Sequence, residues 1–358
     1  MLECSYLKLP PAQVSVSPLG DEVPGGPVHS VPSEEHTESH VHTEHQPSQL
    51  ETANLKYSVR DLELMHKFST ETYKSLCGDE SDMQDWQSLI PQYAYTYEFL
   101  LQAMLALAAL HITATTTDSE RALSFLDTAL QYNNLSFGPF RDAVNNLTPQ
   151  NCDAVYASSA IITVLGISMP YLDSKYRGQH LSMVDTMTTA FDLLQGAYNI
   201  SWISGPWLQA RIFSKYGFWE MQTAELDDDT SSAIERLIQL NHPTREVNEA
   251  EHNTNRESIE FLRSCFAKFT HSPHPAPILG WLLYAKRDFV DRLRSRRPFE
   301  LLVFMHWGVL LNELGGHFWW ARGSGKALVV ELLSELTSSD GDTRWIQALR
   351  WPQGKVGA

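Results

Sequence analysis

The sequence predicts an all-α fold: a large bundle of about ten or more helices, preceded by a disordered N-terminal tail. After Leu55, apolar residues recur at the three- and four-residue spacing of amphipathic helices, and no stretch shows the sustained alternation of a β-strand. Residues 1–54 differ, with seven prolines, one lysine and a single aromatic residue, Tyr6. Such a stretch buries too little apolar surface to offset the entropy lost on ordering, so we expect a disordered linker.

The first predicted helix places its apolar residues near one helical stripe. These residues are Val59, Leu62, Met65, Tyr73 and Leu76. This spacing predicts a helix.

The next three predicted helices rest on different signals. Residues 99–112 are apolar all round, which predicts a fully buried helix. From Ala122 to Asn133, apolar residues recur at i, i+3, i+4, i+7 and i+8, which predicts an amphipathic helix. Thr148 and Pro149 have the residue types of an N-cap and a first helical position, so a further helix is expected to start there and to end near Gly166.

The remaining helices follow the same spacing, and segments rich in Gly and Pro separate several of them. No fixed repeat period is present. The predicted ranges are residues 183–198, 206–219, 231–240, 256–269, 278–293, 299–314 and 327–336.

Composition and charge exclude several classes of protein. The formal net charge is −16, and because DNA is bound through clustered Lys and Arg, the chain is a poor nucleic-acid binder by itself. The longest apolar run, residues 99–112, is shorter than the ~20 residues of a membrane span, so none is expected. The four cysteines are dispersed and no secretory signal precedes them, which favours a reducing intracellular compartment.

Two segments resemble ligand sites but have simpler interpretations. His36, His40, His42 and His45 offer nitrogens for zinc or nickel, yet they lie in the Pro-rich acidic linker and are better explained as a solvated low-complexity stretch. Residues 323–326 (GSGK) lack the spacing of a phosphate-binding loop and follow no strand, so a helix-initiating loop is preferred.

The charged runs favour structural roles. Lys286, Arg287, Arg292, Arg294, Arg296 and Arg297 form the one dense cation cluster, which is interpreted as the surface of a helix near its C-terminal end. The acidic run at residues 227–229 precedes a helix and favours its N-terminus.

No catalytic, cofactor-binding or metal-binding residue is assigned. His306 and His317 lie near tryptophans without any catalytic motif, and we interpret them as hydrogen-bonded core residues. An enzyme is therefore disfavoured, although a pocket with two or more converging titratable groups would support one.

Several segments, in order, resemble one family of transcription regulators. Residues 99–111 resemble the signature helix of the fungal-specific regulatory domain, which occurs in factors carrying a six-cysteine binuclear zinc cluster. Residues 62–69 and 151–155 are similar to helix-opening segments of its sterol uptake control subgroup. Toward the C-terminus the matching segments are residues 303–311, the Trp319-Trp320 pair, Trp345 and residues 350–352.

The resemblance implies a domain organisation. Residues 55–358 would be the regulatory domain, and residues 1–54 a linker that starts with a remnant of the zinc cluster. In that remnant, Cys4 precedes Ser5 and Tyr6, as the last cluster cysteine often does. One cysteine cannot hold two zinc ions, so we expect zinc, and DNA binding, only through an upstream cluster missing from this sequence.

The resemblance also implies a function: a nuclear transcription regulator of a metabolic gene cluster or of sterol-related genes, and not an enzyme. The implied partners are a sterol or other apolar ligand in a helical pocket, the transcription machinery, full-length relatives and a second copy of the chain. The alternative is a stand-alone interaction or lipid-binding protein that lost DNA binding.

Overall fold

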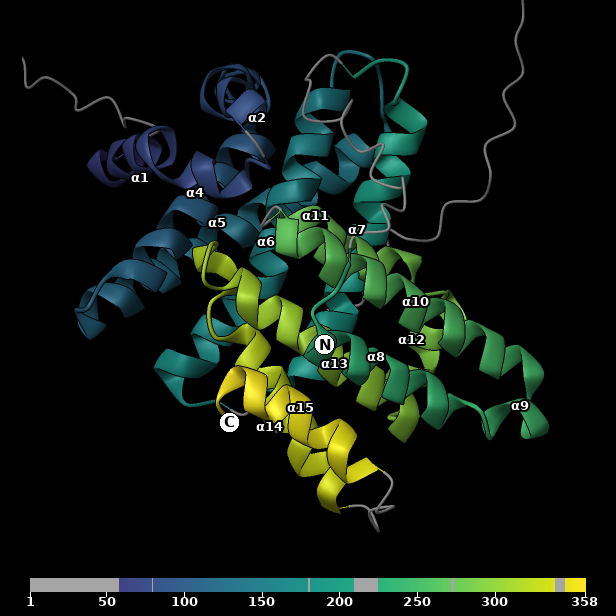
Figure 1. Ribbon diagram of the computed structural model, residues 1–358. Helices are drawn as coiled ribbons and strands as arrows, with labels where there is room; N and C mark the ends of the chain where they lie inside the picture. Colours follow the sequence, from purple (N-terminus) through teal and green to yellow (C-terminus); the bar gives the residue numbers. More distant parts are fainter. Residues whose placement is uncertain (1–57, 79, 180, 209–224, 272–273, 339–344) are drawn as a thin grey trace, which may run out of the picture. The chain divides into compact units, whose positions relative to one another are not determined.

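Helices make up all of the regular secondary structure in the part of the chain that the computed structural model describes (Figure 1). That part is residues 58–358 without 79, 180, 209–224, 272–273 and 339–344. No strand occurs within it, so the predicted all-α fold is confirmed. The predicted linker and most of the helix predicted over 206–219 lie outside the described residues.

Residues Val59–Ala358 form one compact unit. Single turns of tighter or wider helix lie at Thr72–Leu76, Asp85–Leu89 and Trp319–Ala321. The α-helices are α1 (Val59–Thr70), α2 (Glu80–Gln84), α3 (Ile90–Ala94), α4 (Glu98–Thr115), α5 (Ser119–Asn145), α6 (Cys152–Arg177), α7 (Met183–Ser204), α8 (Asp228–Asn241), α9 (Thr244–Val247), α10 (Glu249–His271), α11 (Pro275–Tyr284), α12 (Arg287–Arg294), α13 (Pro298–Leu314), α14 (Ser324–Ser338) and α15 (Ile346–Val356).

Helix α4 is the most buried element of the N-terminal half. Its Leu, Ala and Met residues have high helix propensity and leave no polar face. It packs against α1, α5 and α6, so every residue from Ala103 to Thr113 is buried. The buried helix expected over 99–112 is thereby confirmed, with only Leu101 and Gln102 partly exposed. The amphipathic helix expected from Ala122 is also present, as part of α5.

Helix α13 has the same role in the C-terminal half. It is buried along most of its length and packs against α14, α15 and α10. Its Phe304 and Trp307 stack on each other and on Trp281 of α11, with ring centroids 5.1–6.1 Å apart. The Nε1 atom of Trp307 donates to the carbonyl of Ile278 at 2.9 Å, and that of Trp281 to the carbonyl of Ser258 at 2.9 Å. These aromatic rings fill the core rather than lining a space.

Glycines bring α13 and α14 into close contact. A Cβ atom on Gly325 would lie 2.2 Å from the backbone nitrogen of Asn312 and 2.6 Å from the carbonyl oxygen of Gly308. Only a residue without a side chain allows this approach. Helix α14 begins at Ser324, so residues 323–326 initiate a helix, as expected. The Lys326 ammonium donates to the carbonyl of Gly357 at 2.7 Å.

The predicted stripe is found only in part: Tyr73 is buried, and Met65 and Leu76 pack against the core. Val59 and Leu62 are exposed, and the buried residues of α1 are Asp61, Leu64 and Phe68. Asp61 lies on the inner face because its carboxylate accepts a hydrogen bond from the hydroxyl of Tyr132 in α5. A buried acid with a partner on another helix cannot be found from apolar spacing alone.

The predicted bounds of α6 are also wrong. Thr148 and Pro149 form a turn, and the helix begins at Cys152. The helix continues beyond Gly166 to Arg177. Gly166 lies inside it, where the missing side chain leaves space for Leu193 of α7. A Cβ on Gly166 would lie 2.4 Å from Cδ1 of Leu193 in α7.

Two C-terminal predictions need correction. The single helix expected over 278–293 is divided into α11 and α12 by the extended residue Ala285, whose ψ is 113°. Helix α15 was not predicted, although it contains the Arg350-Trp351-Pro352 segment. Its few apolar residues and its internal proline hide the helical spacing.

Two helices, α4 and α6, are long and apolar enough to cross a membrane by length and composition, with mean hydropathies of 1.4 and 1.5. The length argument made from residues 99–112 therefore fails, because α4 extends to Glu98 and Thr115. In both helices 72% of the apolar window is buried inside the protein, as in core helices, so the two are weak support for a membrane span.

Gly325→Ala tests the contact between α13 and α14. The added methyl group would force the helices apart, so we expect the free energy of unfolding in urea to fall by about 1–3 kcal/mol or more. Gly138→Ala in α5 is the matched control, because no heavy atom lies within 4 Å of its added Cβ. There we expect a gain of about 0.5–1 kcal/mol from the better helix former. Equal effects at the two positions would contradict the close contact.

Candidate functional site: a polar cleft and its surroundings

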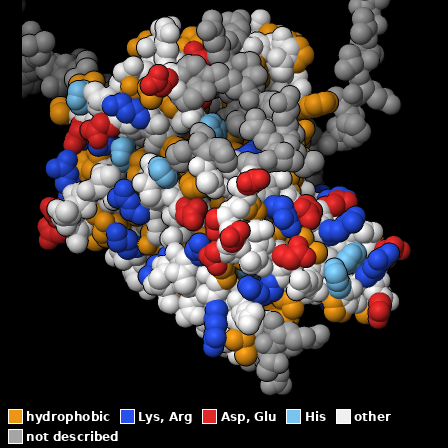
Figure 2. Space-filling view, in the orientation of Figure 1, with side chains coloured by type: hydrophobic (Ala, Val, Ile, Leu, Met, Phe, Trp, Pro, Cys, Tyr) orange, Lys and Arg blue, Asp and Glu red, His pale blue; other side chains and the backbone are white. Residues whose placement is uncertain are grey.

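A cleft of about 330 Å³ opens between α1, the end of α4 and the start of α5. Most of its lining is polar or charged. Acidic, basic and histidine side chains are likewise intermixed over the face of the molecule that Figure 2 shows. The cleft is lined by Glu63, His66, Lys67, Glu71, Ile112, Thr115, Thr116 and Arg121.

Helix geometry places the charges of the cleft in a row. Glu63, Lys67 and Glu71 are four residues apart, so they lie along one side of α1 and its last turn. The Lys67 ammonium pairs with the Glu71 carboxylate, and this hydrogen bond lowers the pKa of Glu71. Arg121 reaches Glu63 from α5 at 3.2 Å, where the Asp118 side chain caps the helix.

His111 lies behind the cleft and holds no charge near neutral pH. Burial lowers its pKa to about 4, and the positive charge of Lys67 acts in the same direction. Its Nδ1 atom lies 2.9 Å from the Thr72 hydroxyl, and its ring stacks on Trp319 with centroids 4.7 Å apart. The back of the cleft is thus attached to the C-terminal part of the chain.

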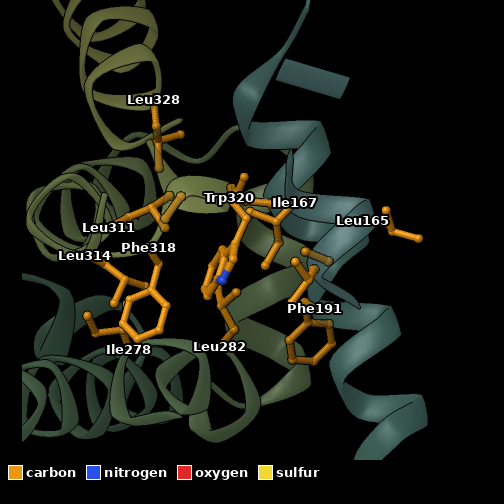
Figure 3. Packing of buried hydrophobic residues seen from close by; sticks show 14 of the residues in the cluster. Leu165, Ile167, Phe191, Ile278, Leu282, Leu311, Leu314, Phe318, Trp320 and Leu328 are labelled. Carbon is orange, nitrogen blue, oxygen red and sulfur yellow. The ribbon is translucent and has the colours of Figure 1, made fainter. Parts of the chain in front are cut away.

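The Trp319-Trp320 pair joins the two halves of the fold. The Nε1 atom of Trp319 donates to the Ser75 hydroxyl, and that of Trp320 to the Ser75 carbonyl, each at 2.9 Å. Figure 3 shows Trp320 among apolar side chains, with Phe318 on one side and Ile167 and Phe191 on the other. We refer to Ser75, His111, Trp319 and Trp320 as the tryptophan junction.

Most cations of the basic run form ion pairs, and several of these pairs are well exposed to solvent. The paired cations face acids on α7, α10, α12, α13 and α14, which agrees with the interpretation as a helix surface. Part of the prediction is wrong: Lys286 and Arg287 start α12, and only Arg292 and Arg294 lie in its last turn. The pairs are Lys286–Glu257, Arg292–Glu300, Arg294–Asp192, Arg294–Asp291, Arg296–Asp185, Arg296–Glu331, Arg296–Glu335 and Arg297–Glu251.

Arg296 and Glu300 are the most constrained members of these ion pairs. Arg296 has a φ of 54°, a left-handed backbone that non-glycine residues adopt only where their surroundings hold them. Its guanidinium joins the start of α7 to α14. The Glu300 carboxylate is 1% exposed and accepts from Nε of Arg292 at 2.7 Å. Since Arg292 also donates to Asn255 of α10, this buried acid fixes the position of α12.

The other predicted site residues have structural partners. His306 is a core residue: its Nδ1 atom lies 2.9 Å from the carbonyl oxygen of Leu302, its ring stacks on Trp351, and burial lowers its pKa to about 4. His317 is exposed beside Phe269, so the prediction of a core position was wrong for it. Asp227 caps α8 by accepting from the Thr230 backbone N–H at 3.0 Å, as its position predicted.

The described cysteines do not fit a zinc cluster. Cys77, Cys152 and Cys265 are buried thiols in separate parts of the fold. Within the described ranges, no group of three or more His, Cys, Asp or Glu side chains is placed to hold a metal ion. Cys4 and the four histidines at positions 36–45 lie outside those ranges, as the linker does.

The cleft was not predicted, and its chemistry differs from an apolar ligand pocket. Titratable groups do converge on it. However, Lys67 lowers the pKa of Glu71, whereas a carboxyl group that acts as a general acid needs a raised pKa. The spacing of Glu63, Lys67 and Glu71 was visible in the sequence as an alternating charge row on a helix. Arg121 and Ile112 join it only through the fold.

The chain is similar to two known fungal proteins, one of which is a transcription factor by name. It is 22% identical over 310 residues to a Zn(2)-C6 fungal-type transcription factor of Gibberella zeae, which covers 82% of this chain and 61% of that protein. It is 32% identical over 105 residues to Sterol uptake control protein 2 of Saccharomyces cerevisiae, which covers 28% of this chain and 11% of that protein. The resemblance to fungal zinc-cluster transcription factors is confirmed.

The two matches differ in extent. The chain spans about three fifths of the length of the first relative and about a tenth of the second. No family model matches the sequence. Both relatives are fungal proteins, and the first is by name a transcription factor rather than an enzyme.

Arg292→Ala tests the buried ion pair. The change leaves the Glu300 carboxylate buried without its cation, so we expect the free energy of unfolding to fall by about 3–5 kcal/mol in urea titrations. Lys286→Ala removes the Lys286–Glu257 pair, in which both side chains are more than half exposed, and should cost about 0–1 kcal/mol. A small loss in both variants would show that α12 is held by its apolar contacts alone.

The two buried histidines predict a pH dependence. In the folded state the pKa values of His111 and His306 are about 4, below the ordinary value of 6.5. Their contribution to stability is therefore complete above pH 6.5, is lost as the pH falls toward 4, and amounts to roughly 3 kcal/mol per histidine. Urea unfolding at pH 7 and pH 4.5 measures the loss.

A pair of variants makes this test specific. His111→Asn should lose less stability between these pH values than the unsubstituted protein does. The control His317→Asn changes an exposed histidine and should keep the full pH dependence. An unchanged dependence in His111→Asn would contradict the assigned role of His111.

Proposed function

We propose that this chain is the regulatory part of a fungal zinc-cluster transcription factor and that it acts in the nucleus. The observation that carries the proposal is the sequence match to a Zn(2)-C6 fungal-type transcription factor over 82% of the chain. The all-helical fold of residues Val59–Ala358 agrees with the domain expected from that resemblance.

Charge supports a regulatory role in which this part of the protein does not itself contact DNA. The net charge is −16, and most cations of the one dense basic run are paired with acids of the same chain. DNA binding needs cations that are free to replace the counterions of phosphate. We therefore assign DNA contact to a separate zinc cluster, for which the described cysteines offer no ligand set.

The finer functional assignments rest on the resemblance. We propose target genes of a metabolic cluster or of sterol metabolism, a sterol or similar apolar ligand, and contacts with the transcription machinery or a second copy. The name of the second relative, Sterol uptake control protein 2, supports the proposal of sterol-related target genes and a sterol ligand. The alternative is a stand-alone interaction or lipid-binding protein that joins full-length relatives.

A reporter experiment tests the regulatory role. The 358-residue chain is fused to an unrelated DNA-binding domain and expressed in a fungal cell that carries the matching reporter. We expect reporter output to change at least about threefold relative to the DNA-binding domain alone, a free-energy difference of roughly 0.6 kcal/mol in recruitment. Gly325→Ala, in which the α13–α14 contact is disrupted, is the control and should reduce the effect.

Two further outcomes separate the alternatives. In gel-shift experiments the unfused chain should select no DNA site, and selection of a defined site would contradict the proposal. An inactive fusion, together with co-purification of an intact zinc-cluster factor, would favour the stand-alone interaction protein. Saturable binding of a radiolabelled sterol to the purified chain tests the ligand assignment separately.

A further inference from the structure

The polar cleft contains a continuous row of alternating charges. In order, these are Arg121 of α5, Glu63 and Lys67 of α1, and Glu71, which directly follows α1. Arg121 pairs with Glu63, and Lys67 with Glu71, so the cleft holds two cations and two anions. A ligand that carries one net charge would meet both attraction and repulsion along this row.

The pairs in the cleft are exchangeable. The side chains of Glu63, Glu71 and Arg121 are 48%, 57% and 53% exposed, and ion pairs in such positions contribute little to stability. Lys67 is different, because its side chain is only 17% exposed and its ammonium is directed at Glu71. A ligand can therefore replace a weak internal pair without leaving a buried charge alone.

We propose that the cleft binds a small zwitterion of the α-amino acid type, with a free ammonium and a free carboxylate group. The ligand carboxylate is bound by Lys67 and Arg121, and the ligand ammonium by Glu63 or Glu71. Each ligand charge thus meets a protein charge of opposite sign, and the charge balance of the cleft is kept.

The remaining walls set the size and character of the ligand side chain. The rest of the lining is made by His66, Thr115, Thr116 and one apolar residue, Ile112. The hydroxyl of Thr115 already donates to the carbonyl of His111 at 2.8 Å, and that of Thr116 accepts from the Asp118 backbone N–H. Both hydroxyls thus already form hydrogen bonds at the end of α4. Because they are less available to a ligand hydroxyl, the cleft favours a ligand with a short aliphatic side chain over a sugar.

Binding in the cleft is connected to the tryptophan junction. Ile112 lines the cleft, and the adjacent His111 stacks on Trp319. Glu71 likewise precedes Thr72, whose hydroxyl contacts His111. A bound ligand should therefore stabilise the contact between the N-terminal helices and the C-terminal half. The site exists independently of the proposed transcriptional role, so a failure of either leaves the other standing.

Isothermal titration of the purified 358-residue chain tests the proposal, with L-valine and L-threonine as probes. We expect saturable binding at one site. N-acetyl-L-valine lacks the ammonium and L-valine amide lacks the carboxylate, and each should bind at least about tenfold more weakly, as expected for losing a charge-assisted hydrogen bond. Equal binding of valine and both derivatives would overturn the proposal, as would no saturable binding of either amino acid up to about 5 mM.

Substitutions locate the site on the chain. Lys67→Gln and Arg121→Gln should each weaken L-valine binding at least about tenfold, and Arg121 is exposed enough for its variant to keep the fold. Lys175→Gln, an exposed lysine outside the cleft, is the control and should bind as the unsubstituted chain does. Circular dichroism checks that all three variants are folded. Unchanged binding in both cleft variants, or binding of D-glucose in place of the amino acids, would overturn the proposal.

Discussion

The hydrogen bonds from Trp319 and Trp320 to Ser75 are the constraint on which the rest of the structure depends. They join residues 244 and 245 positions apart, and both indole N–H groups end on one serine. Two adjacent tryptophans therefore hold the turn after α1 in a single position. That position also determines where Thr72 meets His111, and so how the end of α4 lies behind the polar cleft. An apolar contact of similar area is less directional, so it would fix the position of the turn after α1 less well.

The charged network around α12 has a comparable role in the other half. The chain has a net charge of −16, and most arginines of its densest basic group form ion pairs with acids of the same chain. The buried Glu300 makes this arrangement specific, because only a well-placed guanidinium offsets its burial. The same contacts position α12 between α7 and α13.

Sequence spacing predicted the helices whose burial is uniform or regular, as in α4 and α5. It failed where one residue has a partner far away in the chain. Asp61 is buried because of Tyr132, and Gly166 continues a helix because Leu193 occupies the space beside it. The division between α11 and α12 depends on the backbone of Ala285, whose residue type gives no signal. For the described C-terminal helices, the sequence predicted the presence of most helices, but not their first and last residues.

The cleft illustrates the same limit for function. Glu63, Lys67 and Glu71 have the spacing of an ordinary solvated helix face, and Arg121 is 58 residues from Glu63. Burial separates the two kinds of ion pair in this protein. The Arg292–Glu300 pair is closed to solvent on its acidic side and holds helices together, whereas the Arg121–Glu63 pair is about half exposed on both sides. A ligand can compete only with the second kind, because there its own charges replace a contact that contributes little to folding.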